Sequence, residues 1–338
     1  MAHQSPDERI SSVRWYHRFE ILPGVFTPGS VAFDAAMLLD SIGIPKDMSG
    51  KSAIDIGAWD GPMAFELERR GARVIALDVL DPNETAFNVA KELLGSRVEH
   101  VRGSVYDLGH LFNEPFDLVC FLGVYYHLTD PFRAFEEVSH VVSADGQVFF
   151  EGECLRNYAE TRDGVPVQND LIRQIAVSDL PLALLCPGVY KKSPNWCIPN
   201  FACLSGWLGI VGLELVRHYF EEAADSIPPH QRIKGLAVKR RPSIAIEEIN
   251  QMGRTLIVTG SDFSERTVIN FYCNLDGQQV NLGGLAHDGG VKIPTTVEGT
   301  GKLRFELPAW VKPGRVLVQA LNPPFKINQC AGFEFDVQ

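Results

Sequence analysis

The chain has 338 residues, 45% of them hydrophobic, which is enough for two domains with separate cores. Its formal net charge of −11 argues against a broad surface for nucleic acid, although a local basic groove is compatible with it. The polar start lacks the apolar stretch of a signal peptide, and no run of about 18 apolar residues occurs, so we expect a cytoplasmic protein without a membrane span.

The first 50 residues read as a cap segment that contains a Pro/Gly-rich turn pair, "LPGVFTPGS". Strand-like and helix-like stretches then alternate, which predicts an α/β domain with a doubly wound, Rossmann-like, seven-stranded sheet over residues 51–245. The expected strands are 52–57, 73–79, 98–104, 116–123 and 146–153, and the expected helices are 63–71, 84–95 and 131–142.

A long, rather apolar insertion over about 160–198 follows the fifth strand and reads as a lid. After it we expect a helix over 198–212 and two antiparallel strands, 213–222 and 232–241, joined by a turn at Pro228 and Pro229. From about Thr255 only short alternating strands and turn residues occur, so we predict a separate all-β sandwich over 250–338.

Residues 53–78, "AIDIGAWDGPMAFELERRGARVIALD", predict a strand, a glycine turn, a helix and a second strand. Trp59 and Pro62 stand where a dinucleotide fingerprint requires glycine, which argues against NAD. An acid before the turn instead suits S-adenosyl-L-methionine, which carries an ammonium and a sulfonium but no phosphate, and an acid ending the next strand suits ribose hydroxyls. The alternative is ordinary turn residues and a helix cap. The proposed cofactor residues here are Asp55, Gly57, Gly61 and Asp78.

The later strands supply the rest of the candidate site, because ligands bind at the carboxyl ends of parallel strands. Ser104 and Val105 follow the third strand, where an adenine would lie, although a plain loop is an equal reading. Leu122 ends the fourth strand beside the cofactor. Tyr126 is a candidate aromatic contact for the sulfonium, and His127 is a candidate base or acceptor-orienting residue. A packed structural histidine is the alternative.

Further candidates face the acceptor. Glu151 and Glu153 end the fifth strand and could take a proton or steer the substrate, unless they are merely solvated. We assign Glu151 with Tyr126 and His127 to catalysis, and we expect Asn200 mainly to cap the helix that follows it. The substrate-binding candidates are Tyr125, Glu153, Asn200 and Arg232. No metal-ligand spacing accompanies these residues, so we expect no metal; the seven cysteines form no C-x-x-C pair and read as buried thiols.

The first-strand turn, "FDLVCFLGVYYHLTDP" and "NWCIPN" resemble the class I S-adenosylmethionine-dependent methyltransferase superfamily over about residues 14–240. Within it, the chain is similar to the branch that includes the bacterial tRNA wobble-uridine carboxymethyltransferase. The resemblance implies that the turn with Asp55 holds the methionine part, that Asp78 holds the ribose, and that Tyr126 lies near the transferred group. The tail resembles an immunoglobulin-like (IPT/TIG-type) module through "LIVTGSDF" and "VLVQALNPP".

The chain also departs from that branch. The tRNA enzyme holds a carboxylated cofactor with basic residues, for which only Arg14, Arg18 and Arg232 are candidates here, and no lysine-rich segment precedes the fold. The apolar lid suits a small acceptor better than an anticodon loop. We therefore expect O- or N-methylation of a metabolite, sugar or secondary-metabolite scaffold. The alternatives are a tRNA-modifying methyl- or carboxymethyltransferase and a binding module whose methyltransferase fold is inactive. A homo-oligomer is compatible with the sequence.

Overall fold

A computed structural model describes residues 5–161, 163–186, 190–191, 194–223, 230–239, 244–275, 278–280, 291–309, 311–322 and 332–338. The chain divides into two compact units, Met1–Lys239 and Arg240–Gln338, which are described separately. No helix in the described ranges is both long and apolar enough to cross a membrane.

The first unit is built on a seven-stranded mixed sheet with the strand order β14-β15-β9-β8-β5-β6-β7. The five strands from β9 to β7 in that order are parallel, and β15 and β14 add an antiparallel hairpin. The doubly wound sheet and its closing hairpin are therefore confirmed, while the expected turn at Pro228 and Pro229 lies outside the described residues. The strands are β5 (Ser52–Ile56), β6 (Arg73–Asp78), β7 (Glu99–Arg102), β8 (Phe116–Leu122), β9 (Val142–Glu153), β14 (Leu213–Ala223) and β15 (His230–Lys239).

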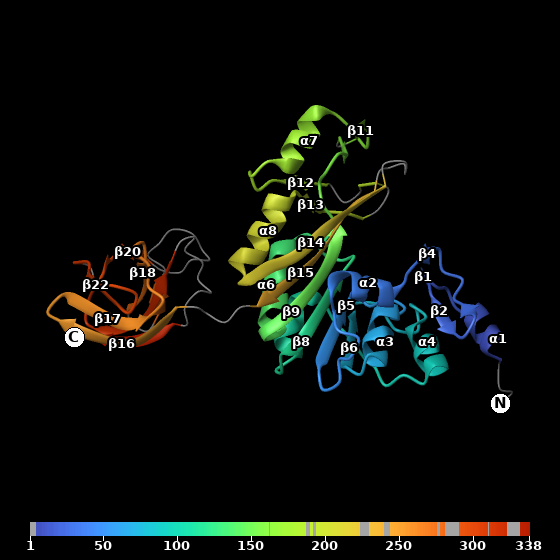
Figure 1. The fold of residues 1–338 in the computed structure, drawn as a ribbon, viewed down its shortest axis with the longest axis horizontal. Helices are drawn as coiled ribbons and strands as arrows, with labels where there is room; N and C mark the ends of the chain where they lie inside the picture. The colour runs from blue at the N-terminus through green and yellow to red at the C-terminus, as the bar shows by residue number, and fades with distance from the viewer. Residues whose placement is uncertain are drawn as a thin grey trace. The chain divides into compact units, whose positions relative to one another are not determined.

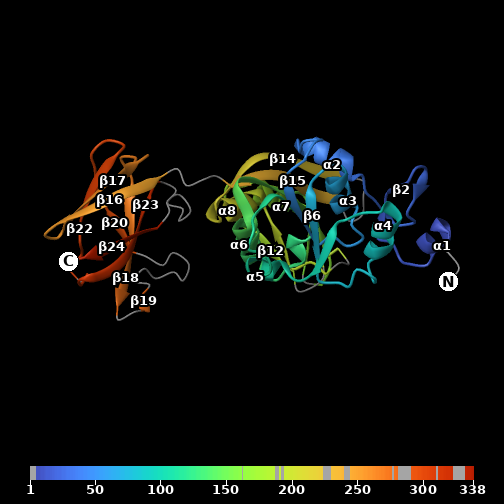
Figure 2. The same ribbon diagram turned by 90° about the horizontal axis from the view of Figure 1, so that it is seen from below.

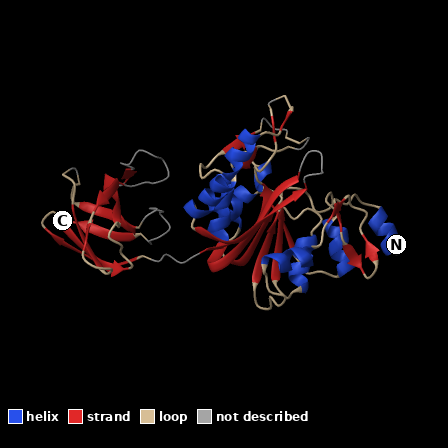
Figure 3. Cartoon of the chain, turned by 45° about the horizontal axis from the view of Figure 1, so that its top comes forward, coloured by secondary structure: helices blue, strands red, loops and turns tan. Residues whose placement is uncertain are grey.

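Helices cover both faces of this sheet (Figure 3). Side chains alternate along each strand, so that Ile54 joins the core shared with α6 and α8, while Ala53 joins the core shared with α2, α3 and α4. The helix expected over 84–95 begins only at Phe87, because Ala86 has a left-handed φ of 64°. The helices are α3 (Pro62–Arg69), α4 (Phe87–Leu94), α5 (Leu108–Leu111), α6 (Pro131–Val141) and α8 (Phe201–Ile210).

Residues 5–33 form a small layer in which α1 and β2 contact α4, with Ser5 and Glu8 in a capping box at its start, whereas α2 packs against α3 and β15 (Figure 2). Four short strands follow the first helix, and a second helix then leads into β5. The elements are α1 (Pro6–Ser11), β1 (His17–Arg18), β2 (Glu20–Leu22), β3 (Val25–Phe26), β4 (Val31–Ala32) and α2 (Ala35–Ile42).

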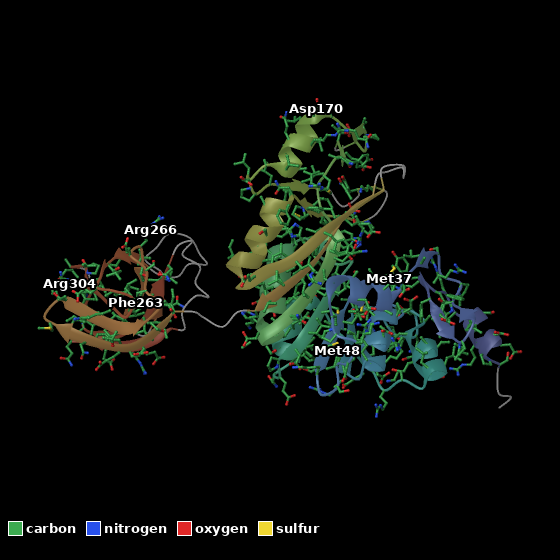
Figure 4. The ribbon with its side chains drawn as sticks, in the orientation of Figure 1. Met37, Met48, Asp170, Phe263, Arg266 and Arg304 are labelled. Atoms are coloured by element: carbon green, nitrogen blue, oxygen red, sulfur yellow. The ribbon has the colours of Figure 1, made fainter. Side chains whose placement is uncertain are left out.

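The insertion after β9 stands beyond the ends of β9, β14 and β15, and Figure 4 marks Asp170 at the start of its helix (Figures 1 and 4). The expected apolar lid does not bury its most apolar run, "LPLALLC" (residues 180–186), because Leu180, Leu182 and Leu185 are exposed. The run forms an edge strand, in which alternate side chains face opposite ways and Leu185 points to solvent. The elements are β10 (Ala159–Glu160), β11 (Pro166–Val167), α7 (Asp170–Val177), β12 (Ala183–Leu185) and β13 (Cys197–Pro199).

The second unit consists of strands in its described residues, in antiparallel sheets that share one hydrophobic core. Phe271 and Phe305, from different sheets, pack with ring centroids 6.2 Å apart. The unit begins with β16, a strand that the sequence reading missed, and its likeness to an immunoglobulin-like module stays a prediction. The strands are β16 (Ala245–Met252), β17 (Thr255–Ser261), β18 (Val268–Leu275), β19 (Gln278–Val280), β20 (Val291–Pro294), β21 (Thr296–Val297), β22 (Lys302–Glu306), β23 (Gly314–Leu321) and β24 (Phe333–Val337).

Candidate active site

The turn between β5 and α3 has the geometry that its glycines predict. Gly57 and Gly61 have φ values of 77° and 87°, and a Cβ on Gly61 would lie 2.7 Å from ring carbons of Phe65 and Phe87. Glycine is therefore required at that position. The carboxylate of Asp55 accepts the backbone N–H of Ala64 in the first turn of α3, so the acid lies at the positive end of this helix.

The two acids of the proposed cofactor half are both buried. Burial and the neighbouring charge of Asp78 raise the pKa of Asp55 to about 7. Asp78 accepts the backbone N–H groups of Trp59 and Leu80, each at 2.9 Å. Neither acid forms an ion pair with a basic side chain in the described part of the chain. Uncompensated buried carboxylates fit a cationic ligand, and both the ammonium and the sulfonium of S-adenosylmethionine meet that requirement.

The turn is also a poor dinucleotide site. Trp59 adopts a φ of 50° and has 39% of its residue surface exposed, where a pyrophosphate would need to approach the backbone. The residue after Asp78, Val79, exposes 58% of its surface, and the sequence reading missed this exposed apolar side chain beside an acid.

The loop after β7 is the third part of the proposed cofactor half. Ser104 caps a short 3-10 helix, Val105–Asp107, through its hydroxyl, which accepts the Tyr106 N–H at 3.2 Å. Val105 is buried, and the Tyr106 hydroxyl accepts the backbone N–H of Asp130 at 3.1 Å. The loop is therefore held in place by the segment that follows β8. Its adenine contact stays a prediction, as does that of Leu122 at the end of β8.

The proposed acceptor half brings together Tyr126, which follows β8, with Glu151 and Glu153 of β9 and Arg232 of β15. Arg232 lies opposite Glu153 in the antiparallel pairing of β15 with β9, which puts it at the carboxyl edge of the sheet. Its guanidinium forms a two-pronged ion pair with Glu151, with one N–O distance of 2.7 Å, and lies 3.7 Å from Glu153. It also donates to the hydroxyl of Tyr126 at 2.9 Å.

The hydrogen bond from Arg232 limits the chemical role that Tyr126 can have. Burial raises the pKa of Tyr126 to about 12, so the hydroxyl stays protonated at neutral pH. Because arginine can only donate, the tyrosine oxygen accepts and its own hydrogen remains available for a second partner. Tyr126 is thereby suited to orient an acceptor atom rather than to remove its proton.

His127, in the short 3-10 helix Tyr125–His127, is held by the insertion. Its Nδ1 lies 2.8 Å from the carbonyl oxygen of Pro194, which can only accept, so Nδ1 carries the hydrogen and Nε2 is the basic nitrogen. Burial lowers the pKa of His127, which keeps the ring neutral at pH 7. The Trp196 N–H donates to the Tyr126 carbonyl at 2.8 Å, so the segment Pro194–Trp196 is fastened to this loop at two points.

Two further residues belong to this region and were missed. Lys191 donates to Glu153 at 2.9 Å and has only 9% of its side chain exposed, which ties the insertion to the end of β9. Asn195 is buried and donates from Nδ2 to the Tyr190 carbonyl, while its Oδ1 has no hydrogen-bond partner within the described ranges. Asn195 lies in the motif "NWCIPN", which could have pointed to it, whereas no local pattern marks Lys191 as a partner of Glu153.

Two substrate-binding candidates are corrected. Tyr125 is fully buried and donates its hydroxyl hydrogen to the Glu153 carbonyl at 2.6 Å, so it packs in the core instead of facing an acceptor. Asn200 caps α8 as expected, but its amide also donates to Ile175 and Leu180, which satisfies the side chain internally. The segment that it organises, and not its own amide, is what it can contribute to a site.

A cavity of about 260 Å³ lies at the amino ends of strands β8 and β9, opposite the carboxyl ends that carry the candidate site. It is lined by Phe112, His140 and Lys239 among others, and none of the residues discussed above reaches it. The site is therefore assigned from the chemistry at the carboxyl edge. No cluster of three or more potential metal ligands occurs in the part of the chain described, and its five buried cysteines, Cys120, Cys154, Cys186, Cys197 and Cys203, are free thiols.

With this geometry in place, the chain can be compared with known proteins. Residues 54–150 match a methyltransferase domain model. This match runs from β5 into β9, so it includes Asp55, Asp78 and Tyr126 but ends before Glu151, and it supports the class I superfamily and S-adenosyl-L-methionine as the cofactor.

The chain is 24% identical over 185 residues to a tRNA U34 carboxymethyltransferase of Trichodesmium erythraeum, covering 51% of this chain and 47% of that protein. It is 31% identical over 102 residues to a ubiquinone biosynthesis O-methyltransferase of Salmonella paratyphi A, covering 30% of this chain and 42% of that one. The chain thus spans about half or less of the length of these relatives. A 1,6-didemethyltoxoflavin-N1-methyltransferase of Burkholderia thailandensis aligns over 61% of this chain and 76% of its own, at 17% identity and a TM-score of 0.42, too low to support an argument.

Proposed function

We propose that the protein transfers a methyl group from S-adenosyl-L-methionine to an oxygen or nitrogen atom of a small-molecule acceptor. The observation that carries this proposal is the contact of the insertion with the Tyr126–His127 loop, through the His127 side chain and the Trp196 N–H. A segment fastened to this loop restricts access to the carboxyl edge of the sheet, which suits a small acceptor better than a folded RNA.

The cofactor half of the site supports the same function. Asp55 would face the ammonium of the cofactor, Asp78 would accept from its ribose hydroxyls, and Val79 would lie along its adenine with Ser104 and Val105. When bound, the cofactor supplies an activated methyl group on a good leaving group. The protein then has to align the acceptor and exclude water.

In this proposal Tyr126 and His127 of the acceptor half have different roles. Tyr126, held by Arg232, donates its hydroxyl hydrogen to the acceptor and positions it. Neutral His127 offers Nε2 to take the proton when the acceptor group is a hydroxyl, or a protonated amine that must lose its proton before it can attack. Glu151 keeps Arg232 in position through the ion pair and acts as a positioning residue rather than a base, because its oxygens are committed to the guanidinium.

The second candidate is tRNA modification, which the printed names of relatives such as the Trichodesmium protein favour. A carboxylated cofactor would require a free basic residue near the transferred group. Of the three basic candidates, Arg14 and Arg18 are exposed, and Arg232 already pairs with Glu151. We therefore rank this function second.

The experiment that separates the candidates uses radiolabelled S-adenosylmethionine with two acceptor pools, a small-molecule extract and bulk tRNA, after mass spectrometry of the ligand that the purified protein retains. Label in small products supports the proposal. Label in tRNA, or retention of a carboxylated cofactor, would replace it with the second candidate.

A further inference from the structure

Residues 15–33, here called the strap, contact the turn between β5 and α3 (residues 57–61, here called the cofactor turn). The strap is held together by its own contacts: β1 pairs with β4, and the Thr27 hydroxyl donates to the His17 carbonyl at 2.7 Å. Gly29 lies so close to His17 that a Cβ would fall 2.1 Å from the His17 carbonyl oxygen. The strap therefore behaves as one packed piece, and its position depends on what fastens it to the sheet.

Asp60 supplies that fastening. Its side chain is fully buried, and one carboxylate oxygen accepts the backbone N–H groups of Tyr16 and His17 at 2.9 and 2.8 Å. The other oxygen contacts Nδ1 of His17. A buried carboxylate with three donors from one segment is a strong, directional link, because each bond to a charged group is stronger than a neutral one.

Asp60 is also part of the cofactor turn, directly between Trp59 and Gly61. Trp59 gives its backbone N–H to Asp78, and its ring lies 5.0 Å from the ring of Tyr16, centroid to centroid. The strap, the turn and the proposed ribose-binding acid thus form one connected set of contacts. A shift of the strap would displace the backbone of the turn.

We propose that Asp60 is a positioning residue that closes the strap onto the cofactor turn, and that release of this contact opens the site for cofactor exchange. The proposal rests on the proposed function only for the identity of the ligand. Cofactor binding favours the closed strap, and the closed strap strengthens cofactor binding by the same factor, since coupling between two such states acts equally on both binding free energies. Because the closed strap has to open before the cofactor leaves, the stronger binding appears as slower release.

The test uses Asp60→Leu, which keeps the approximate shape but removes all three acceptor contacts, and Asp60→Asn, which keeps an oxygen for the two backbone N–H groups. The matched control is Asp47→Asn, because Asp47 is an exposed acid that accepts a backbone N–H from Ser49 at 2.9 Å outside the strap. We expect Asp60→Leu to bind S-adenosylhomocysteine about tenfold more weakly, mainly through faster release, a typical size for such coupling. Asp60→Asn should restore most of the affinity, and Asp47→Asn should match the wild type.

Hydrogen exchange at the strap provides the readout that a general loss of stability would not reproduce. In the ligand-free wild type the Tyr16 and His17 amides should be protected, and S-adenosylhomocysteine should slow their exchange further. In Asp60→Leu these two amides should exchange fast, with and without ligand, while β8 and β9 keep their protection. If Asp60→Leu does not fold, His17→Ala removes one of the three contacts and should speed ligand release by a smaller factor.

The outcomes separate the two proposals. Unchanged exchange at Tyr16 and His17 in Asp60→Leu would overturn the strap contact. Normal release of S-adenosylhomocysteine from a variant with an unprotected strap would overturn the role in cofactor exchange. Failure of the wild type to bind S-adenosylhomocysteine would overturn the proposed function instead, and the exchange data on the ligand-free protein would still decide the contact.

Discussion

Asp55 should make cofactor binding depend on pH in a range where most carboxylates do not titrate. Its pKa is raised to about 7 by burial and by the charge of Asp78. The ammonium of S-adenosylhomocysteine would bind the ionised carboxylate, so binding must release a proton wherever the free protein holds one. Asp55→Asn removes the titration and the charge while keeping the shape of the side chain.

The pKa sets the size of the effect. At pH 6 about one Asp55 in ten is ionised, so the affinity should be about tenfold below its value at pH 8, and at pH 5 about a hundredfold. The raised pKa of Asp55 also makes the ligand-free protein less stable at higher pH, which is the opposite of the usual effect of a carboxylate. The folded pKa lies above the ordinary value of 3.8, so the ligand-free protein loses stability as pH rises from about 4 to about 7, by about 4 kcal/mol at most. Asp55→Asn should therefore melt at a higher temperature than the wild type at pH 8, although it binds the ligand poorly.

Calorimetric titration with S-adenosylhomocysteine between pH 5 and 8, in buffers of different ionisation enthalpy, measures both the affinity and the protons released. The matched ligand is 5′-methylthioadenosine, which lacks the ammonium and should show a flat profile. Asp117→Asn is the matched variant, since Asp117 pairs with Lys51 at the start of the sheet. A flat profile for S-adenosylhomocysteine, or wild-type affinity in Asp55→Asn, would refute the assignment of Asp55.

Three further outcomes follow from the site. Asp78→Asn should weaken S-adenosylhomocysteine binding by about 1.5–3 kcal/mol, because a charged hydrogen-bond partner is lost, and unaltered affinity in this variant would remove Asp78 from the site. Calorimetry should also detect no NAD binding to the wild type. Tyr126→Phe and His127→Ala should lower kcat more than they lower cofactor affinity, and unchanged kcat in both would place the acceptor elsewhere. A chain that ends at Lys239 should still bind S-adenosylhomocysteine, and a folded truncation that fails to bind would assign the second unit a part in the site.

The sequence correctly predicts the parts of the fold that depend on local residue patterns. The strand, glycine turn and helix around Asp55 follow from alternation, from glycines with positive φ and from the apolar spacing of α3. The sequence does not determine the structure of the insertion, because a short apolar run such as 180–186 is compatible either with a buried segment over the site or with an edge strand. The structure makes it an edge strand, and its exposed leucines follow from that choice.

The missed contacts of the site join residues that are far apart in the chain. Asp60 binds residues 43 and 44 positions earlier, and Lys191 lies 38 positions after Glu153. Each of these residues, taken alone, reads as an ordinary polar position. Their roles come from the path of residues 15–33, which returns to the turn after β5, and from the path of the insertion, which returns to the end of β9.

The charges of the site differ between its two halves, and this difference bears on which ligands it can take. In the cofactor half, Asp55 and Asp78 are buried with no basic partner in the described ranges, so that half gains from a cationic ligand. In the acceptor half, Glu151 and Glu153 are matched by Arg232 and Lys191. A matched set of charges has no net demand for an ionic acceptor, and an anionic group would have to displace Glu151 from Arg232 at the cost of leaving a buried carboxylate unpaired. An acceptor that is neutral and offers a lone pair to the hydroxyl of Tyr126 meets both conditions, and we therefore propose a small polar molecule as the acceptor in preference to a phosphate backbone, and an uncharged methyl in preference to a carboxylated cofactor.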